Sequence, residues 1–573
     1  MATIEEIRSK SEEYVQWDPV DSTREEIATL IKEERWEDLR IRIMNRLVFG
    51  TAGLRGRMGA GYSCMNDLVV LQTAQGLSEY LLDTFGEEAK SRGVVVGYDH
   101  RAYGDLSSKS FFDITVKVFS QKGIKVYAFH QFAFTPLVPF VISEYHCCAG
   151  IMITASHNPA ADNGYKIYWE NACQIIPPHD IGISNAITKN LKPWCSYATL
   201  PVPEVVDVTD EAIQKYMSHT VKVLHKNSDE MNNKCPRIMY TAMHGVGYRY
   251  VKELLHHFHL PEVAIVNEQI NPDPSFPTVS FPNPEEKGAL DLAMKMADKE
   301  GIEYVMATDP DADRFICCQK TSNGWHVFKG DEIGAIFGYY MCSHSEGEKR
   351  CLINSVVSSR LLLKIGEHFG VRCDQTLTGF KWMGNRQAEL EENGYVPMVT
   401  YEEAIGYAVG GVLRDKDGVS ATAKMCEIIS DLVASGSGLV EYLAEIYSVC
   451  GYFTTRNGYV ISHDKLYTDE VFERLRNQGN YLFQMGSYPV KSIRDLTTGF
   501  DSVQEDQRAV LPVDPSSQMI TFEFTNGACL TLRTSGTEPK IKYYLEVTHN
   551  EKIECEKLGD AMEMTMKRIV FDQ

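Results

Sequence analysis

Short apolar runs alternate with amphipathic helical stretches along most of the chain, and this alternation predicts α/β domains. Residues 93–129, 237–266 and 351–377 each contain an apolar strand-like run, a helix-like stretch and a second apolar run. That order is typical of a βαβ unit, in which parallel strands are buried on both faces. Because the three copies lie far apart in the chain, they predict three similar α/β domains.

The two ends of the chain follow other patterns. The first 48 residues have apolar positions at helical spacing and many charges, so they predict helices packed outside the first domain. Residues 520–535 alternate apolar and polar positions around Asn526-Gly527, which is a strong hairpin signal. A further strand and a long helix follow, so the C-terminal part is predicted to be a smaller α+β domain.

Changes of pattern give the predicted domain boundaries. They fall near Val205–Asp210, after Gly330 and near Gly451. Within these domains, the proline-rich stretch 271–288 predicts a long loop, because proline cannot donate the backbone hydrogen bonds of regular structure. The length of segment 456–500 suggests an insertion in the last domain. The predicted domains are 1–208, 209–330, 331–452 and 453–573.

Charge and composition exclude several classes of partner. The chain has 57 Lys and Arg against 78 Asp and Glu, a net charge of −21. We therefore expect no nucleic-acid partner and no membrane surface, and an anionic substrate would need a local basic pocket. No apolar run approaches the roughly 20 residues that span a bilayer. With no secretory signal pattern and 15 irregularly spaced cysteines, we expect a cytoplasmic protein with reduced thiols.

The stretch TASHNP, residues 154–159, follows an apolar strand-like run and predicts an exposed turn that carries Ser156. A Ser-His hydrolase needs an imidazole that reaches the serine oxygen, and His157, as the next residue, is expected to point elsewhere. The chain has no GxSxG elbow at this serine and no Walker A motif. A serine that carries or receives a phosphoryl group remains, since phosphoryl transfer depends mainly on positioning and charge neutralisation.

The stretch ATDPDADRF, residues 307–315, contains three alternating aspartates after an apolar run. A loop can bring Asp309, Asp311 and Asp313 together, and their mutual repulsion then favours a bound cation. Hard oxygen ligands in this number suit Mg²⁺. The alternative is a solvated acidic turn.

Three further loops carry candidate binding groups. LRTSGTEPKIK, residues 532–542, combines an arginine, hydroxyls, a glycine and lysines, which together suit a phosphate, although an ordinary turn is the alternative. TYEEAIGY, residues 400–407, offers two adjacent carboxylates to sugar hydroxyls. TGFKWMGN, residues 378–385, is a glycine, aromatic and lysine loop, and like the carboxylate pair it is a weak signal alone.

Together these motifs resemble those of the α-D-phosphohexomutase superfamily, in the same order and over essentially the whole chain. The resemblance implies an α/β fold of four domains around a central cleft, three related mixed α/β sandwich domains and a C-terminal α+β domain. The phosphoserine loop would lie in 1–208, the metal loop in 209–330, the sugar loop in 331–452 and the phosphate loop in 453–573.

The resemblance also implies a role for each candidate residue. Ser156 would carry the phosphoryl group and, with Asp309, Asp311 and Asp313, would bind one Mg²⁺. Arg55, His157, Lys166 and Lys416 would act in catalysis, with the histidine and the first lysine assisting proton transfer. The substrate-binding residues would be Arg314, Gly379, Lys381, Glu402, Arg533, Ser535, Gly536, Thr537 and Lys542.

The sugar loop, together with GFKWM and the RTSGTEPK loop, resembles the phosphoglucomutase-2 branch, which contains phosphopentomutases. Its sequence Tyr401-Glu402-Glu403-Ala404 has alanine where hexose-selective glucomutases typically have serine. We expect a phosphosugar mutase that interconverts sugar 1-phosphates with 5- or 6-phosphates through a phosphoserine and a bisphosphate. Glucose 1,6-bisphosphate or a related sugar bisphosphate would activate it, and it would be a monomer or weak homodimer. The preference for pentose or hexose stays open.

Two other functions remain as alternatives. The same residues could make a glucose 1,6-bisphosphate synthase that takes its phosphoryl group from 1,3-bisphosphoglycerate. A non-catalytic sugar-phosphate sensor is the more remote alternative.

Overall fold

The computed structural model describes residues 2–50, 53–195, 203–462, 464–535 and 539–572. The chain forms two compact units, each described here by itself. Unit 1 contains Met1–Ile353 and Gly379–Val440, and unit 2 contains Asn354–Thr378 and Glu441–Gln573. The domain boundaries near residues 208, 330 and 452 stay predictions.

Unit 1 begins with helices that pack on one another, as the charged helical pattern predicts. The first of them starts with a capping box, in which the Thr3 side chain accepts from the Glu6 amide and Glu6 accepts from the Thr3 amide. Their apolar positions Ile7, Tyr14 and Ile27 are buried. These elements are α1 (Ile4–Trp17), α2 (Asp21–Lys32), α3 (Trp36–Leu39) and the π-helix η1 (Arg40–Met44).

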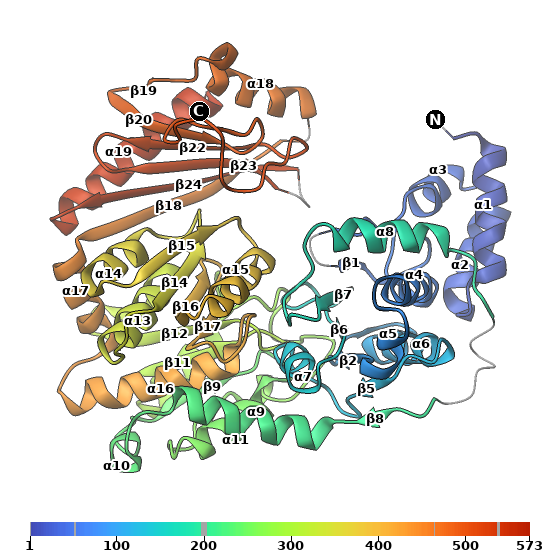
Figure 1. Ribbon diagram of the computed structural model, residues 1–573, viewed down its shortest axis with the longest axis horizontal. Helices are drawn as coiled ribbons and strands as arrows, with labels where there is room; N and C mark the ends of the chain where they lie inside the picture. The colour runs from blue at the N-terminus through green and yellow to red at the C-terminus, as the bar shows by residue number, and fades with distance from the viewer. Residues whose placement is uncertain (1, 51–52, 196–202, 463, 536–538, 573) are drawn as a thin grey trace. The chain divides into compact units, whose positions relative to one another are not determined.

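The first sheet of unit 1 has six strands in the order β1-β7-β6-β2-β5-β8. Strands β2, β5, β6 and β8 are parallel, whereas β7 runs antiparallel to both β1 and β6. Every residue of β2 is buried, because α6 and α7 both pack against it (Figure 1). The bounds are β1 (Gly53–Arg57), α4 (Asp67–Phe85), α5 (Glu87–Arg92), β2 (Val94–Tyr98), β3 (Ala102–Tyr103), β4 (Leu106–Ser107), α6 (Ser108–Gln121), β5 (Val126–Ala128), α7 (Leu137–Tyr145), β6 (Ala149–Ile153), β7 (Asp162–Trp169), α8 (His179–Lys189) and β8 (Val206–Asp207).

The second sheet of unit 1 has the order β10-β9-β11-β12-β13, with a parallel core and an antiparallel edge. The predicted loop 271–288 contains no described helix or strand. The bounds are α9 (Thr209–Leu224), α10 (Asp229–Asn232), β9 (Ile238–Thr241), α11 (Gly247–His257), β10 (Ala264–Ile265), the 3₁₀ helix η3 (Asn267–Gln269), α12 (Asp291–Glu300), β11 (Tyr304–Thr308), β12 (Phe315–Thr321) and β13 (Gly324–Val327).

The last part of unit 1 contributes the antiparallel pair β16 and β17. Its helix α16 packs against β17 and also against α11, so it covers the second sheet as well. Cys426 on α16 accepts at its carbonyl from the Cys235 thiol at 3.6 Å. The bounds are α13 (Gly330–Ser343), β14 (Arg350–Ser355), α15 (Phe380–Glu392), β16 (Val396–Glu402), β17 (Gly406–Val409) and α16 (Gly418–Ala434).

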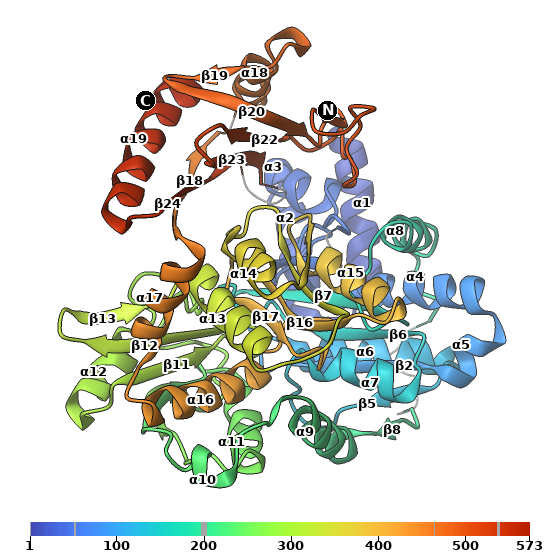
Figure 2. The same ribbon diagram turned by 60° about the vertical axis from the view of Figure 1, so that its left-hand side comes forward.

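Unit 2 is built on a sheet of seven strands in the order β18-β24-β23-β22-β20-β19, with β21 beside β20. Helix α19 packs along β18 and β24 (Figure 2). The bounds are α14 (Leu361–Phe369), β15 (Arg372–Thr376), α17 (Leu439–Cys450, which begins in unit 1), β18 (Tyr452–Ile461), α18 (Lys465–Arg476), the 3₁₀ helix η4 (Asn477–Gly479), β19 (Gln484–Met485), β20 (Tyr488–Asp495), β21 (Phe500–Asp501), β22 (Met519–Phe524), β23 (Cys529–Thr534), β24 (Lys540–His549) and α19 (Lys552–Phe571).

The structure confirms one prediction for this unit and shows that segment 456–500 forms part of its sheet. Strands β22 and β23 form the hairpin predicted at Asn526-Gly527, and Gly527 has φ of +85° as such a turn requires. The segment 456–500, whose length suggests an insertion, supplies β20 and most of β18, and β18 pairs with β24 over ten residues. Its alternation of polar and apolar positions is weak, which hid these strands.

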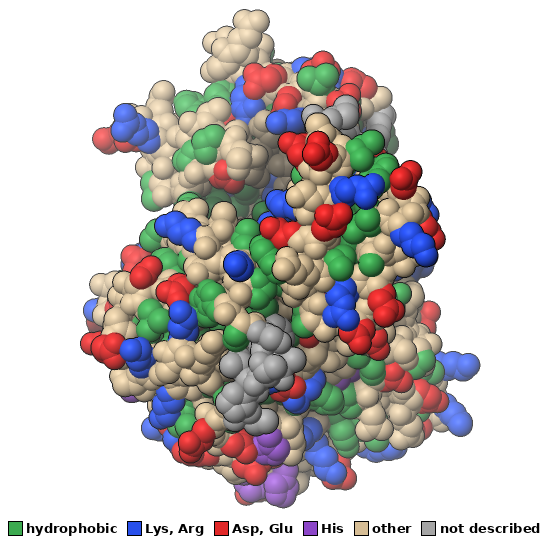
Figure 3. All heavy atoms as spheres, turned by 90° about the vertical axis from the view of Figure 1, so that its right-hand side faces the viewer, with side chains coloured by type: hydrophobic (Ala, Val, Ile, Leu, Met, Phe, Trp, Pro, Cys, Tyr) green, Lys and Arg blue, Asp and Glu red, His purple; other side chains and the backbone are tan. Residues whose placement is uncertain are grey.

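Two surface features bear on the classes of partner. Among the described residues, no helix combines the length and the apolar character that crossing a membrane requires. On the face shown in Figure 3, Lys and Arg side chains are interspersed with Asp and Glu side chains.

Asp67, the first residue of α4, is a buried carboxylate that makes folding pH-dependent. Its Oδ2 has no hydrogen-bond partner among the described residues, and burial together with Asp18 raises its pKa to about 7. Because the folded pKa lies above the unfolded value of about 3.9, this group destabilises the fold increasingly as pH rises from about 4 to 7.

We expect Asp67→Asn to stabilise the protein, and to do so more at pH 8 than at pH 5. The two pH units between 5 and the folded pKa correspond to about 2–3 kcal/mol at 1.36 kcal/mol per unit. Thermal melts of both proteins at each pH measure this difference. Asp83→Asn, an exposed carboxylate on the same helix, is the control and should show no such change. An equal stabilisation at both pH values would contradict the assignment.

Candidate active site

The three aspartates of the predicted metal loop lie together directly after β11. Their carboxylates are buried, and one oxygen of each lies within 4.8 Å of the others. Ala312, between two of them, has φ of +56°, and this turn lets Asp309, Asp311 and Asp313 converge. The alternative of a solvated acidic turn is therefore wrong, since all three residues are at most 1% exposed.

The electrostatics of this cluster fit a cation. Asp311 Oδ1 and Asp313 Oδ1 are buried and accept no hydrogen bond from any described residue. Burial and the charges of the other two aspartates raise the pKa of Asp309 well above its usual range. Three carboxylates this close together, with oxygens that accept no hydrogen bond, could hold a metal ion, which would relieve their mutual repulsion.

Ser156 lies beside the cluster, on the loop that follows β6. Its Oγ donates to Asp309 Oδ2 at 2.7 Å, and the side chain is buried rather than exposed as the sequence predicted. The residue has φ of +53°, and its amide donates to Thr154 Oγ1 at 2.8 Å. A serine held in the left-handed region is strained, and such strain often marks a functional site.

His157 does not point away from the serine, contrary to the sequence-based prediction. Its Nδ1 lies 3.2 Å from Ser156 Oγ, because the left-handed turn at the serine brings the two side chains to the same side. Burial and the neighbouring Arg314 and Arg55 hold the pKa of His157 well below its usual range. The imidazole is therefore neutral at physiological pH and can exchange a proton with the serine oxygen.

Arg101 holds the serine loop in place, and the sequence reasoning missed it. The guanidinium is fully buried and donates to four backbone carbonyls of residues 156–162. Nη2 reaches Ser156 O at 2.5 Å and Asn158 O at 2.7 Å, while Nη1 reaches Pro159 O and Asp162 O at 2.9 and 3.1 Å. Its position three residues after the strand that ends at Tyr98 was the available signal.

Two lysines from distant parts of the chain meet the aspartates. Lys166 Nζ on β7 lies 2.7 Å from Asp311 Oδ2 and 2.8 Å from Asp313 Oδ2. Lys416 Nζ lies 3.6 Å from Asp313 Oδ2 and 5.1 Å from the centre of the Phe380 ring. Although burial opposes ionisation, Lys166, Lys416 and Arg314 lower the pKa of Asp313 strongly. The structure thus places both predicted catalytic lysines at the metal loop.

The sugar loop also faces the metal loop. Glu402 ends β16, and burial raises its pKa although Lys416 counteracts the effect. Arg314 Nη1 donates to the carbonyl of Ala404 at 3.1 Å. From the proline-rich loop, Glu285 comes close to this arginine, and burial raises its pKa to about 7. The sequence reasoning treated that loop only as irregular and missed Glu285.

The other predicted residues of unit 1 have simpler surroundings. Arg55, on β1, is exposed, and its Nη1 donates to Asn158 Oδ1 at 3.4 Å, so it lies at the serine loop. Gly379 precedes α15 with φ of +99°, and Lys381 follows in its first turn. Since Phe380 between them lies against Lys416, the start of α15 lies at the same site.

The predicted phosphate loop belongs to unit 2. Arg533 lies on β23, where its Nη2 donates to the Tyr544 hydroxyl at 3.0 Å. Lys542 on β24 is its partner in the strand register. The Ser535 amide donates to Lys540 O at 2.9 Å. Gly536 and Thr537 lie outside the described residues. This unit brings together an arginine and lysines, as a phosphate site requires.

Sequence and structure comparisons place this arrangement in a known family. The chain matches the α/β/α domains I, II and III of the phosphoglucomutase/phosphomannomutase family at residues 46–193, 214–324 and 329–449. Its fold is similar to a crystal structure of parafusin, a phosphoglucomutase from Paramecium, with a TM-score of 0.69, 19% identity and coverage of 91% of this chain and 96% of the other.

Curated relatives cover almost the whole chain. A phosphopentomutase of Homo sapiens is 43% identical, and a probable phosphoribomutase of Schizosaccharomyces pombe is 42% identical. These matches cover 93% of this chain and 90% and 92% of the relatives. A glucose 1,6-bisphosphate synthase of Homo sapiens is 39% identical, over 93% of this chain and 89% of its own.

These findings agree on one family: the three matched domains, the buried serine at the aspartate triad, and relatives that cover nearly the full length. The chain belongs to the phosphoglucomutase/phosphomannomutase family within the α-D-phosphohexomutase superfamily, in its phosphopentomutase branch, and is a phosphosugar mutase.

Proposed function

We propose that this protein interconverts pentose 1-phosphates and pentose 5-phosphates, with Ser156 as the phosphoryl carrier. The observation that carries the proposal is the hydrogen bond of 2.7 Å from the buried Ser156 Oγ to Asp309 in the aspartate triad. In the resting enzyme Ser156 would be phosphorylated. Asp309, Asp311 and Asp313, with a phosphoserine oxygen, would hold Mg²⁺, which neutralises charge on the transferred group.

The reaction has two transfers related by reorientation of the intermediate. In the first, the P–O bond to Ser156 breaks while a P–O bond forms to the free hydroxyl of the sugar phosphate, giving a sugar bisphosphate. In the second, the other phosphoryl group returns to Ser156. In each transfer the proton of the attacking hydroxyl has to reach the oxygen that leaves. The neutral imidazole of His157, 3.2 Å from the serine oxygen, is placed to relay that proton to Ser156 in the first transfer and away from Ser156 in the second. A sugar bisphosphate added from solution would rephosphorylate any free serine and so act as activator.

Other residues would bind the substrate. Lys166, Lys416 and Arg314 concentrate positive charge at the triad, which suits the transferred phosphoryl group. Arg55 at the serine loop is placed to assist them. Glu402, with Gly379 and Lys381, would contact sugar hydroxyls. The phosphate of the substrate that is not being transferred would be bound by Arg533, Ser535, Gly536, Thr537 and Lys542.

The pentose preference rests on two observations. Relatives named for pentose or ribose are 40–43% identical, against 39–40% for relatives named as glucose 1,6-bisphosphate synthases. Ala404 presents a methyl group where the resemblance implies a serine hydroxyl in hexose-selective enzymes, so one contact to a hexose is absent. A lost hydrogen bond of this kind costs about 1 kcal/mol.

We expect kcat/KM for ribose 1-phosphate to exceed that for glucose 1-phosphate by about tenfold or more, which corresponds to 1.4 kcal/mol. Both are measured with Mg²⁺ and a trace of glucose 1,6-bisphosphate. Ala404→Ser should narrow the ratio, whereas Ala434→Ser at the end of α16 should leave it unchanged. A preference for glucose 1-phosphate would refute the pentose assignment and leave the mutase assignment intact.

Arg101 gives a test of the serine loop. Arg101→Lys keeps the buried charge but satisfies fewer of the four carbonyls, so the loop should lose its fixed geometry. We expect kcat to fall about 10²-fold, as for small misplacements of reacting groups, with a smaller change in KM. Arg92→Lys is the control, since Arg92 bonds a carbonyl and a carboxylate away from the site. Unchanged kcat for Arg101→Lys would show that the loop does not need this clamp.

The alternative is a glucose 1,6-bisphosphate synthase, favoured by the 39% identical relative. With 1,3-bisphosphoglycerate and glucose 1-phosphate as substrates, a synthase accumulates the bisphosphate, because it releases that product instead of reorienting it. The mutase proposal predicts that bisphosphate stays at a catalytic level in this assay.

A further inference from the structure

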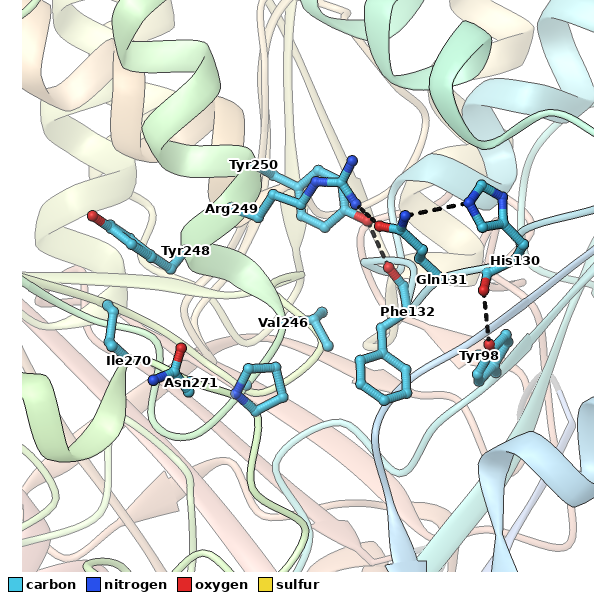
Figure 4. A pocket seen from close by; sticks show the side chains of 12 residues that line it. Tyr98, His130, Gln131, Phe132, Val246, Tyr248, Arg249, Tyr250, Ile270 and Asn271 are labelled. Atoms are coloured by element: carbon cyan, nitrogen blue, oxygen red, sulfur yellow. Dashed lines mark hydrogen bonds between the residues drawn. The ribbon is translucent and has the colours of Figure 1, made fainter.

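A cavity of about 410 Å³ lies in unit 1, apart from the residues of the candidate active site (Figure 4). None of the aspartates of the metal loop and neither Ser156 nor His157 lines it. Its volume is within the usual range for small-molecule sites. The lining residues come from the end of β2, the segment after β5, the start of α11 with the two residues before it, and the segment after η3. They are Tyr98, His130, Gln131, Phe132, Gly245, Val246, Tyr248, Arg249, Tyr250, Ile270, Asn271 and Pro272.

The walls of the cavity suit a planar ring. Phe132 is 41% exposed, and its ring stands edge-on to Tyr98 with centroids 5.8 Å apart. Figure 4 shows Tyr248 and Phe132 on opposite sides of Val246, which leaves apolar surface between two aromatic side chains. A large exposed phenylalanine costs solvation free energy unless a ligand covers it, and aromatic faces stack well on flat heterocycles.

The charge of the lining suits an anionic substituent. The lining residues include no Asp or Glu, although the chain as a whole has a net charge of −21. Arg249 carries the one full positive charge among them. Its Nη1 donates to the neutral Gln131 amide oxygen. Its Nη2 lies 3.9 Å from Oδ1 of Asp210, and the Asp210 side chain is 83% exposed. Such an exposed pair contributes little, so the guanidinium can turn to a ligand anion.

Hydrogen-bonding groups complete the set. The Asn271 amide lines the cavity and can both donate and accept. The Gln131 amide is already engaged, because its oxygen accepts from Arg249 and its nitrogen lies 3.2 Å from His130 Nε2. His130 Nδ1 in turn lies 2.7 Å from Asp207 Oδ2. A ring that carries nitrogen and oxygen atoms can therefore be bound at its edge as well as on its faces.

The cavity is formed before any ligand arrives. The Tyr250 hydroxyl donates to Phe132 O at 2.7 Å and joins the two walls. The floor is fixed from behind by the Val246 amide, which donates to Pro310 O at 2.8 Å. Gly245 packs so closely on this proline that a Cβ would come within 2.3 Å of Pro310 Cα. Preorganisation of this kind reduces the entropy cost of binding.

We propose that this cavity is a second small-molecule site, which binds a planar heteroaromatic monophosphate of the nucleoside monophosphate class. The heterocycle stacks on Phe132, the amide of Asn271 binds its edge, and Arg249 binds the phosphate.

Calorimetric titration of the full-length protein with adenosine 5′-monophosphate tests the proposal. Saturating glucose 1,6-bisphosphate is present throughout, so that the sugar-phosphate site is occupied. We expect one equivalent to bind. Adenosine, which lacks the phosphate, should bind at least about tenfold more weakly than adenosine 5′-monophosphate. Arg249→Met should reduce the affinity for adenosine 5′-monophosphate by a similar factor. Phe132→Leu, which keeps the apolar character, should reduce this affinity several-fold.

Arg237→Met is the matched control, because Arg237 is an exposed arginine of the same sheet region that pairs with Glu300 away from the cavity. It should bind like the wild type. Absence of binding at millimolar concentration, or equal binding by Arg249→Met and the wild type, would overturn the proposal. Binding that occurs only without glucose 1,6-bisphosphate would overturn it too, because the nucleotide would then occupy the sugar-phosphate site. Since the readout is binding, failure here leaves the mutase assignment untouched.

Discussion

Ser156→Ala is expected to abolish phosphosugar mutase turnover, with a fall of at least about 10⁴-fold in kcat. The serine oxygen is the only atom that both phosphoryl transfers share, and an alanine cannot replace it. The fold should survive, because Ser156 Oγ makes its contacts to Asp309 and His157 rather than to the core. Turnover of ribose 1-phosphate and the mass of the intact protein after incubation with glucose 1,6-bisphosphate are the two measurements.

The wild type should gain the mass of one phosphoryl group, and Ser156→Ala should gain none. Ser91→Ala, an exposed hydroxyl of α5 in the same part of the chain, is the control and should behave as the wild type. Full turnover by Ser156→Ala would exclude the phosphoserine mechanism. A variant that turns nothing over while the wild type is never phosphorylated would revive the non-catalytic sensor.

Asp309→Asn is expected to cost about 10³-fold in kcat and to remove the stabilisation that Mg²⁺ gives to the wild type. Burial and the repulsion from the other two carboxylates together raise the pKa of Asp309. Binding of a cation to the native state alone stabilises it by about 2.7 kcal/mol at a hundred times Kd. Neutralising one carboxylate lowers the affinity of the site for Mg²⁺ and also reduces the repulsion among the aspartates.

Thermal melts in EDTA and in Mg²⁺ therefore test whether Mg²⁺ binds at the aspartate triad, which activity alone does not show. The wild type should melt at a higher temperature in Mg²⁺ than in EDTA. Asp309→Asn should melt in EDTA at or above the wild-type temperature and should respond little to Mg²⁺. Asp298→Asn is the control, since this carboxylate is half-exposed beside Lys320 and its loss changes the net charge equally. A full Mg²⁺ response in Asp309→Asn would place the metal elsewhere.

The mutase assignment also explains why a strongly acidic chain can act on phosphates. Lys166 and Lys416 lie within 4 Å of the triad, and Arg314 closes the same site. Positive charge is thus concentrated where phosphoryl groups would bind, inside a protein of net charge −21. The field at such a site depends on these near charges more than on distant surface carboxylates, which salt screens.

The sequence by itself determined the local elements and the chemistry of the site. The βαβ pattern of residues 93–129 appears as β2, α6 and β5, and the hairpin at Asn526-Gly527 forms as predicted. These features depend on side-chain periodicity and turn chemistry, which are local. The three aspartates could be predicted to converge for the same reason, since they lie within five residues of one loop.

Only the tertiary structure decided how distant residues combine. Arg101 reaches the carbonyls of residues 156–162, Glu285 comes to the sugar loop from an irregular segment, and His157 turns toward Ser156 because that serine has positive φ. Strands β18 and β20 lack a strong alternation and were hidden until their partners were known. Such contacts depend on chain topology and packing, and no property of the neighbouring residues in the sequence encodes them.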